Sequence, residues 1–302
     1  MTSVRRKEPS LEGRLAEALR GDRQVINLHF LKNKEELAMK IAAVTIAATA
    51  LVCSVAAPRT AVAQSVENIV LVHGAWVDAS GWKAVFERLE REGFHVSLAQ
   101  PPETAFADDV AATKRVLDAQ DGPTLLVGHS YGGSIITEAG VHPNVVGLVY
   151  VAAHAPDVGE DEGTLGAKTP SVLGKTKGAI EVTPDGFTSL REEDFLTLFA
   201  PDLPREDATF AARSQVFAAA SVFHTPMTAA AWKTKPTWGV VAGADQIINP
   251  DLERWYYERA KAPFVVIEGA SHSVYASHPN EVADVIIKAA RSLGSAKRAA
   301  ND

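Results

Sequence analysis

Apolar and amphipathic segments alternate along most of the chain. Short continuous apolar runs, of the kind that forms buried strands, occupy residues 68–73, 95–99, 123–129, 145–152, 237–242 and 264–268. Segments with helical spacing of apolar residues follow most of these runs, at about 80–92, 105–119, 132–140, 250–259 and 280–293. This alternation predicts an α/β protein with a mostly parallel central sheet that is flanked by helices.

The rhythm changes over about 156–236, which lacks apolar strand-like runs and carries amphipathic pieces around 192–199 and 208–219. We predict that this stretch is a helical lid inserted between two strands of the sheet, and not an independent domain. Its aromatic residues are expected mostly to pack the lid onto the sheet, and some to line an apolar pocket. They are Phe187, Phe195, Phe199, Phe210, Phe217, Phe223 and Trp232.

The segment before the first predicted strand has the pattern of a secretory signal peptide. From Met39, one basic residue and the apolar run 41–57 precede Ala-Val-Ala and Gln64. The apolar run is slightly short for a membrane span, and a membrane anchor is the alternative interpretation. Because signal peptides begin near the initiator methionine, we interpret residues 1–38 as a non-native or disordered N-terminal extension. Residues 64–302 are then expected in the periplasm or outside the cell, without stable membrane insertion.

Composition narrows the possible partners and cofactors. The net charge is −7 and no basic run is present, which disfavours nucleic-acid binding, because phosphate backbones demand clustered Lys and Arg. The one cysteine excludes an intramolecular disulfide and a zinc site built from several thiolates. The nine histidines show no metal-binding spacing. We therefore expect neither a metal nor another cofactor.

A serine lies between the apolar run 123–129 and the helical segment 132–140. Ser130 is the centre of Gly-His-Ser-Tyr-Gly, which fits the Gly-x-Ser-x-Gly pattern. The two glycines let the chain turn sharply from strand to helix, so that the serine oxygen stands above the sheet edge. The N-terminus of the following helix favours negative charge at that point. We therefore predict Ser130 as a nucleophile.

A serine hydroxyl needs a base that removes its proton, and this type of strand-turn-helix site has the order Ser, then Asp or Glu, then His. Asp245 and His272 each follow a predicted strand and have this order. We predict His272 as the base and Asp245 as the acid that orients it. Asp157 and Glu160 are alternatives for the acid. The remaining histidines near strand ends are expected to form local hydrogen bonds: His73, His129, His154 and His278.

The oxyanion that such a nucleophile generates needs two backbone N–H donors beside it. Tyr131 directly follows Ser130, and Ala75 follows the end of the first predicted strand. We predict that Tyr131 and Ala75 supply these donors.

At these positions the chain resembles the α/β-hydrolase superfamily over residues 66–294. His-Gly-Ala-Trp at 73–76, Gly-Trp at 81–82 and Gly-His-Ser-Tyr-Gly-Gly at 128–133 resemble the methylesterase and hydroxynitrile-lyase group and small bacterial carboxylesterases. The resemblance implies the same nucleophile, acid, base and oxyanion donors. Dehalogenases and epoxide hydrolases of this fold carry Asp at the nucleophile position, where this chain has Ser130, so the resemblance does not extend to their activities. Hydroxynitrile lyases of the group carry Lys directly after the catalytic His, where this chain has Ser273.

The sequence therefore predicts a serine hydrolase of the α/β-hydrolase fold. Its expected substrate is a small-molecule ester, or a related acyl compound, with an apolar portion, cleaved through an acyl-enzyme intermediate. The alternative is a non-hydrolytic protein of the same fold, namely a lyase, an acyltransferase or a ligand sensor.

Overall fold

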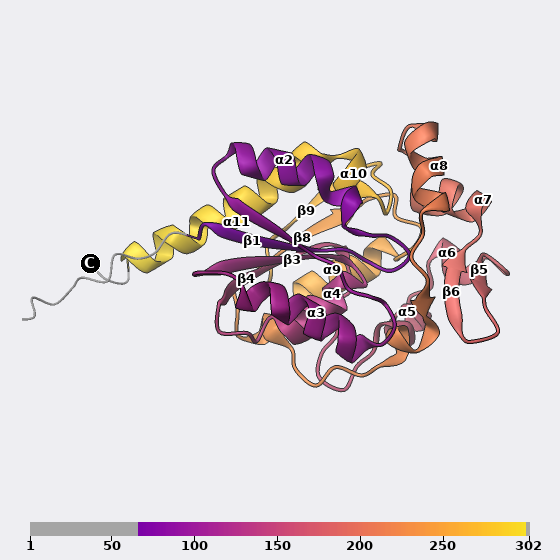
Figure 1. Ribbon diagram of the computed structural model, residues 1–302, viewed down its shortest axis with the longest axis horizontal. Helices are drawn as coiled ribbons and strands as arrows, with labels where there is room; N and C mark the ends of the chain where they lie inside the picture. The colour runs from indigo at the N-terminus through magenta and orange to yellow at the C-terminus, as the bar shows by residue number, and fades with distance from the viewer. Residues whose placement is uncertain (1–65, 300–302) are drawn as a thin grey trace, which may run out of the picture. The chain divides into compact units, whose positions relative to one another are not determined.

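Six parallel strands form the central sheet, in the order β2-β1-β3-β4-β8-β9 (Figure 1). The strands are β1 (Asn68–Val72), β2 (His95–Ala99), β3 (Thr124–Ser130), β4 (Val145–Ala153), β8 (Thr237–Ala242) and β9 (Phe264–Ile267). The computed structural model describes residues 66–299. The predicted extension at 1–38 and the signal peptide at 39–63 lie outside the described residues and stay predictions.

Burial explains why the strands read as continuous apolar runs. Every residue of β1 and β3 is buried, because both faces of the sheet are covered, whereas the edge strands β2 and β9 are partly exposed. The register between β3 and β4 shifts between His129 and Ser130, where β3 ends. The predicted α/β-hydrolase fold is confirmed.

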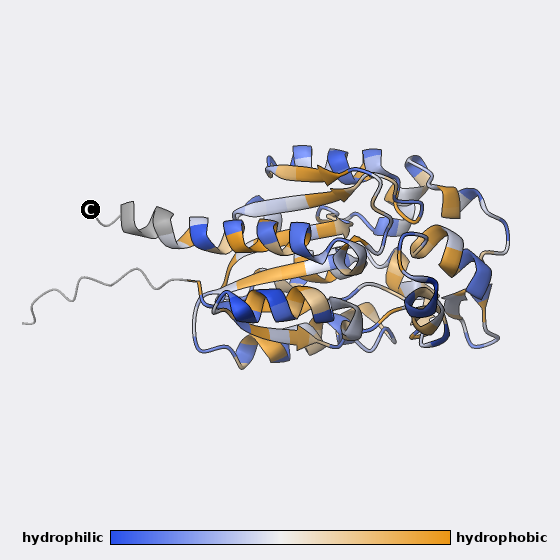
Figure 2. Ribbon diagram, turned by 90° about the horizontal axis from the view of Figure 1, so that it is seen from above, coloured by the Kyte–Doolittle hydropathy of each residue, from blue (hydrophilic) through white to orange (hydrophobic). Residues whose placement is uncertain are grey.

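Helices cover both faces of the sheet (Figure 1). They are α2 (Lys83–Arg91), α3 (Phe106–Asp118), α4 (Gly132–Ala139), α9 (Pro250–Arg259), α10 (Val274–Ser277) and α11 (Pro279–Ala299). One hydrophobic core joins α2 and α11 to one face, and a second joins α3, α4 and α9 to the other. Figure 2 shows the hydropathy of α11 alternating along its length. This helix runs beyond its predicted end near residue 293.

The predicted insertion lies between β4 and β8, and it is not entirely helical. Its elements are α5 (Glu162–Lys168), α6 (Val172–Lys175), β5 (Ile180–Val182), β6 (Phe187–Leu190), α7 (Glu192–Asp194), a π-helix (Phe195–Phe199), α8 (Arg205–Arg213), β7 (Ala218–Ala219) and two 3₁₀-helices (Ala220–His224 and Ala231–Lys233). The three strands form a small antiparallel sheet that the sequence did not predict. Strands of two to four residues are too short to produce an alternating pattern.

The aromatic residues of the insertion divide into three groups, and the first of them, Phe187 and Phe223, is partly buried against the core. Phe195 and Phe199 are buried and stack with ring centroids 4.5 Å apart, and Trp232 is also buried, as predicted. Phe210 and Phe217 are 69% and 51% exposed, so the expectation that they pack against the sheet is wrong. On α8 the buried positions are alanines, which leaves Phe210 on the outer side.

None of the described helices has the length and apolar character that a membrane span requires.

Candidate active site

Ser130 occupies a strained turn between β3 and α4. Its φ is +54°, a region that non-glycine residues adopt rarely and at a cost in energy. A Cβ atom at Gly128 would lie 2.5 Å from the carbonyl oxygen of Gly132, and one at Gly132 would lie 2.5 Å from that of His73. Both glycines are therefore required by the close approach of backbone segments at this turn, as the Gly-x-Ser-x-Gly pattern predicts.

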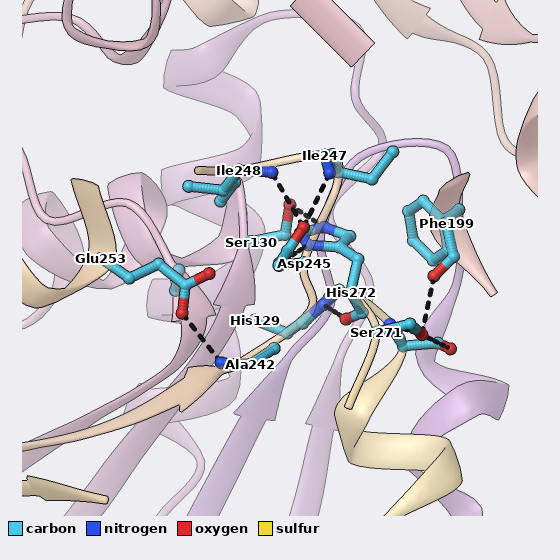
Figure 3. Close-up of polar contacts among 12 residues, drawn as sticks. His129, Ser130, Phe199, Ala242, Asp245, Ile247, Ile248, Glu253, Ser271 and His272 are labelled. Atoms are coloured by element: carbon cyan, nitrogen blue, oxygen red, sulfur yellow. Dashed lines mark hydrogen bonds and ion pairs between the residues drawn. The ribbon is translucent and has the colours of Figure 1, made fainter. Parts of the chain in front are cut away.

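His272 lies between Ser130 and Asp245 (Figure 3). Its Nε2 atom is 2.8 Å from Ser130 Oγ, and its Nδ1 atom is 2.6 Å from Asp245 Oδ2. Asp245 follows β8, His272 follows β9 and Ser130 ends β3, so three strand ends supply the three groups. All three residues are buried. The structure thus brings together the nucleophile, base and acid that the sequence singled out.

The second carboxylate oxygen of Asp245 is also occupied. Asp245 Oδ1 accepts the backbone N–H groups of Ile247 and Ile248, at 2.7 and 2.9 Å (Figure 3). The two alternative acids have other partners: Asp157 pairs with Lys233 at 2.6 Å, and Glu160 pairs with Arg259 at 2.8 Å. In the structure, Asp245 is therefore the acid that contacts His272.

The insertion fixes the loop that carries His272. Asp202, which follows the π-helix, accepts the backbone N–H of Ser271 at 2.8 Å and the hydroxyl of the same residue. The backbone N–H of Ser273 donates to the carbonyl of Phe199 at 3.1 Å. On the sheet side, His129 Nε2 contacts the carbonyl oxygen of His272 at 2.9 Å. Sequence reasoning missed Asp202, since nothing distinguishes it from a solvated acid beside a proline.

Ala75 and Tyr131, the predicted oxyanion donors, line the same cavity as Ser130. A buried pair of carboxyl groups lies behind them. Glu103 accepts the backbone N–H of Trp76, next to Ala75, at 3.1 Å. Asp109 accepts the Tyr131 hydroxyl at 2.5 Å and the backbone N–H of Glu103 at 2.7 Å. The two predicted donors are thus linked through one buried hydrogen-bonded chain.

Burial sets the protonation of this pair. Burial raises the pKa of Glu103 to about 9 and that of Asp109 to about 6. At neutral pH Glu103 is therefore a neutral acid that accepts a hydrogen bond. Glu103 also has a positive φ of 58°, so the backbone here is held in a costly conformation. Neither Glu103 nor Asp109 stands out in the sequence as a supporting group.

A further acid lies near Asp245. Glu253 on α9 is fully buried, and its Oε2 atom accepts the backbone N–H of Ala242 at 3.1 Å (Figure 3). Burial, followed by the negative charge of Asp245, raises the pKa of Glu253 well above its ordinary value. Through its contact with Ala242, Glu253 anchors the end of β8.

A cavity of about 470 Å³ adjoins Ser130. Its wall combines the strand ends with the start of the insertion and residues 247–249. Two lining residues that the sequence did not single out as a site are Glu162 and His154. The lining contains no Lys or Arg, and the part of the chain that the structure describes holds no cluster of three or more side chains suited to a metal ion.

Comparisons with known proteins agree with this architecture. The sequence model described as the alpha/beta hydrolase family matches residues 69–285. An alpha/beta hydrolase of Aspergillus novofumigatus is 25% identical over 254 residues, which cover 74% of this chain and 96% of that protein. The crystal structure of a pyrethroid hydrolase from Sphingobium faniae is 24% identical with a TM-score of 0.63, and the match covers 75% of this chain and 98% of that one. A methylesterase from Arabidopsis is 20% identical with a TM-score of 0.60, covering 74% and 98%.

Proposed function

Because the chain belongs to the alpha/beta hydrolase family, we propose that it is a serine hydrolase that cleaves a small-molecule ester through an acyl-enzyme intermediate. The observation that carries the proposal is the hydrogen-bonded series from Ser130 Oγ to His272 and on to Asp245, at 2.8 and 2.6 Å. These separations lie within the range that proton transfer to a general base requires.

In the first half of the reaction, Ser130 Oγ attacks the ester carbonyl while its proton passes to His272 Nε2. Asp245 holds the imidazole by Nδ1 and stabilises the imidazolium that forms. The carbonyl oxygen becomes an oxyanion, which the N–H groups of Ala75 and Tyr131 bind. The bond from the carbonyl carbon to the alcohol oxygen then breaks, and His272 returns the proton to the leaving alcohol.

In the second half, water replaces the alcohol. His272 takes a proton from the water, whose oxygen attacks the acyl carbon and forms a second oxyanion. Collapse of this intermediate breaks the bond to Ser130 Oγ, which regains the proton from His272. The products are the carboxylic acid and the free enzyme.

Hydrolysis is favoured over the lyase alternative by the position after His272. In this chain the side chain there is the buried hydroxyl of Ser273, which contacts Ser271 Oγ at 3.0 Å and Asp202 at 3.3 Å. No ammonium group stands at that point to stabilise a cyanide leaving group. An apolar portion of the substrate suits the cavity wall, to which Trp76, Leu173, Phe223, Ile247 and Leu252 contribute.

The test is covalent labelling of the purified protein with a fluorophosphonate probe, followed by mass spectrometry of the labelled peptide. We expect one label on Ser130, lost in Ser130→Ala and in His272→Ala. The matched control is Ser292→Ala, which removes an exposed serine on α11 and should label like the wild type. Labelling that survives Ser130→Ala would contradict the proposal. Very slow ester turnover together with tight binding of a ligand would favour the sensor alternative.

We also propose that the protein acts in the periplasm or outside the cell, on the basis of the signal-like pattern at 39–63. N-terminal sequencing of the protein from its native cells should give Gln64 as the first residue. A native N-terminus within residues 1–38 would overturn the interpretation of Met39 as the start.

A further inference from the structure

A buried carboxyl group interrupts the apolar wall of the cavity. Glu162, the first residue of α5, is only 6% exposed and lines the cavity next to Ser130. Its Oε2 atom accepts the hydroxyl of Ser134 at 2.5 Å. Ser134 lies on α4, the helix that begins two residues after Ser130. The insertion therefore carries an acid against the helix that follows the nucleophile.

This carboxyl has no cationic partner among the described residues, and no Lys or Arg lines the cavity. Burial raises the pKa of Glu162 to about 8, so the group carries a proton at neutral pH. Because the Ser134 hydroxyl donates to Oε2, the proton belongs on Oε1. That oxygen forms no hydrogen bond to any described residue, so its donor is left for a group inside the cavity.

A second polar side chain lines the same cavity. His154 follows β4, and its backbone N–H donates to the carbonyl of Ser130 at 3.2 Å. Its ring Nδ1 contacts the hydroxyl of Tyr256 at 3.2 Å. Burial lowers the pKa of His154 to about 3, so the ring is neutral and Nε2 is its remaining polar atom.

We propose that Glu162 and His154 form a hydrogen-bonding subsite for an uncharged oxygen atom of the substrate, such as a ketone or amide carbonyl. This inference rests on the proposed function, and it makes Glu162 a specificity-determining residue. The preferred ester is then an apolar molecule with a second, uncharged oxygen acceptor away from the scissile bond. A wholly hydrocarbon ester leaves a buried donor unpaired, which is how a site built for a hydrogen bond rejects an analogue without one. An anionic ester meets a carboxyl group, and neither Lys nor Arg is among the residues that line the cavity.

The test compares kcat/KM for matched esters in two series. In the first, p-nitrophenyl esters of straight-chain acids of equal length carry a methylene, a keto group, a terminal carboxylate or a terminal trimethylammonium group. In the second, the same groups lie in the alcohol of acetate esters. We expect the keto ester to exceed the hydrocarbon ester by about tenfold or more in one series, the size of a lost specific hydrogen bond.

Three variants separate hydrogen bonding from charge. Glu162→Gln keeps a donor of the same length, and its preference for the keto ester should stay within about threefold of the wild type. Glu162→Met keeps the length but removes the donor, and the preference should disappear. His154→Phe should reduce it in part. The control is Glu181→Met, which changes an exposed glutamate on β5 and should leave the preference intact.

Several results would overturn the subsite. They are an unchanged keto preference in Glu162→Met, a wild-type preference for the hydrocarbon or carboxylate ester, and a preference for the ammonium ester that Glu162→Gln abolishes. The rate of fluorophosphonate labelling at Ser130, measured on each variant, reports the proposed function separately. Normal labelling with unchanged selectivity refutes only the subsite, whereas absent labelling in the wild type refutes the serine hydrolase proposal itself. If Glu162→Met does not fold, His154→Phe and Glu162→Gln still provide the comparison.

Discussion

The strand ends and the insertion each bury a carboxyl group near Ser130, and they surround it differently. The two oxygens of Asp245, at the end of β8, face three groups: two backbone N–H donors and the imidazole of His272. Glu162, at the start of α5, receives one hydroxyl, and the rest of its carboxyl faces the cavity. Both oxygens of the Asp245 carboxyl group therefore have hydrogen-bond partners within the protein. In the Glu162 carboxyl group, one oxygen is left for a ligand.

The same contrast extends in part to the supporting groups. Behind the strand ends, both oxygens of Asp109 accept a hydrogen bond, whereas Glu103 accepts one at Oε2 and its buried Oε1 atom has no hydrogen-bond partner among the described residues. In the insertion, polar groups that face the cavity keep unused hydrogen-bonding capacity. Preorganised donors and acceptors suit chemistry that is common to all substrates. Donors and acceptors without a partner suit selection among substrates. Burying them costs free energy, and this cost is offset only when a substrate group forms the missing hydrogen bond.

The largest expected effect comes from replacing Asp245, the carboxylate whose two oxygens both have hydrogen-bond partners in the protein. Asp245→Asn should lower kcat about 10⁴-fold, because the amide disturbs the tautomer and charge stabilisation of His272. Steady-state kinetics on the best ester measures this effect. Asp157→Asn, at the alternative acid, should change kcat less than about threefold, since that side chain pairs with Lys233 on the outside of the site. The reverse ranking would identify Asp157 as the functional acid.

A second prediction tests how far the insertion shares the stability of the sheet. Phe195→Ala should lower the free energy of unfolding by about 3–5 kcal/mol, because its ring is fully buried and stacks on Phe199. Phe210→Ala should change it by less than about 0.5 kcal/mol, because that ring is exposed. Chemical denaturation followed by fluorescence measures both. Equal losses would mean that the two rings have similar surroundings in solution.

A third prediction removes support from the oxyanion side. Glu103→Leu leaves the buried N–H of Trp76 without its acceptor and should lower kcat by about 10- to 100-fold with little change in KM. Glu103→Gln should remain within about threefold of the wild type, because the amide oxygen still accepts and the native acid is already neutral at pH 7. Equal loss in both variants would point to a requirement for the carboxyl proton instead.

The smallest expected effect is a pH dependence of selectivity. Below pH 8 Glu162 holds its proton and donates; as pH rises through about 8 the donor is lost, so the keto preference should fall several-fold between pH 7 and 9. The other titratable groups near this carboxyl are the same when the keto ester and the hydrocarbon ester are compared. They are Asp161, Tyr131, His154, His224 and Tyr256. The ratio of two kcat/KM values cancels any pH effect that both esters share. In Glu162→Gln the ratio should be flat over this range, and a matching fall there would assign the effect to another group.

The proximity of the predicted nucleophile, base and acid could be predicted from the sequence because their signals are local. The glycines around Ser130 mark a turn that only small residues permit, and the Ser–Asp–His order follows the order of strand ends. The central sheet was equally readable, since buried parallel strands are continuous apolar runs.

The remaining features depend on tertiary contacts that leave no local pattern. Four acids look like ordinary surface residues in the sequence, and only the packing of distant segments buries or pairs them. They are Glu103, Asp109, Glu162 and Asp202. The small antiparallel sheet escaped prediction because its strands are too short for periodicity. Phe210 is the opposite case, because it was predicted to be buried and is exposed. An aromatic residue in an amphipathic segment is expected on the buried face of the helix, but alanines occupy that face of α8.

The contact between Asp202 and the His272 loop has a consequence for modular engineering. Exchanging the whole insertion for that of a relative would also exchange the group that orients the residues on both sides of His272. A chimera that retains the segment from Phe199 to Asp202 and replaces only what precedes it keeps this anchor while it renews the cavity wall. Under the proposed function, the boundary between the segments assigned to catalysis and those assigned to substrate selection therefore falls inside the insertion, and not at its ends.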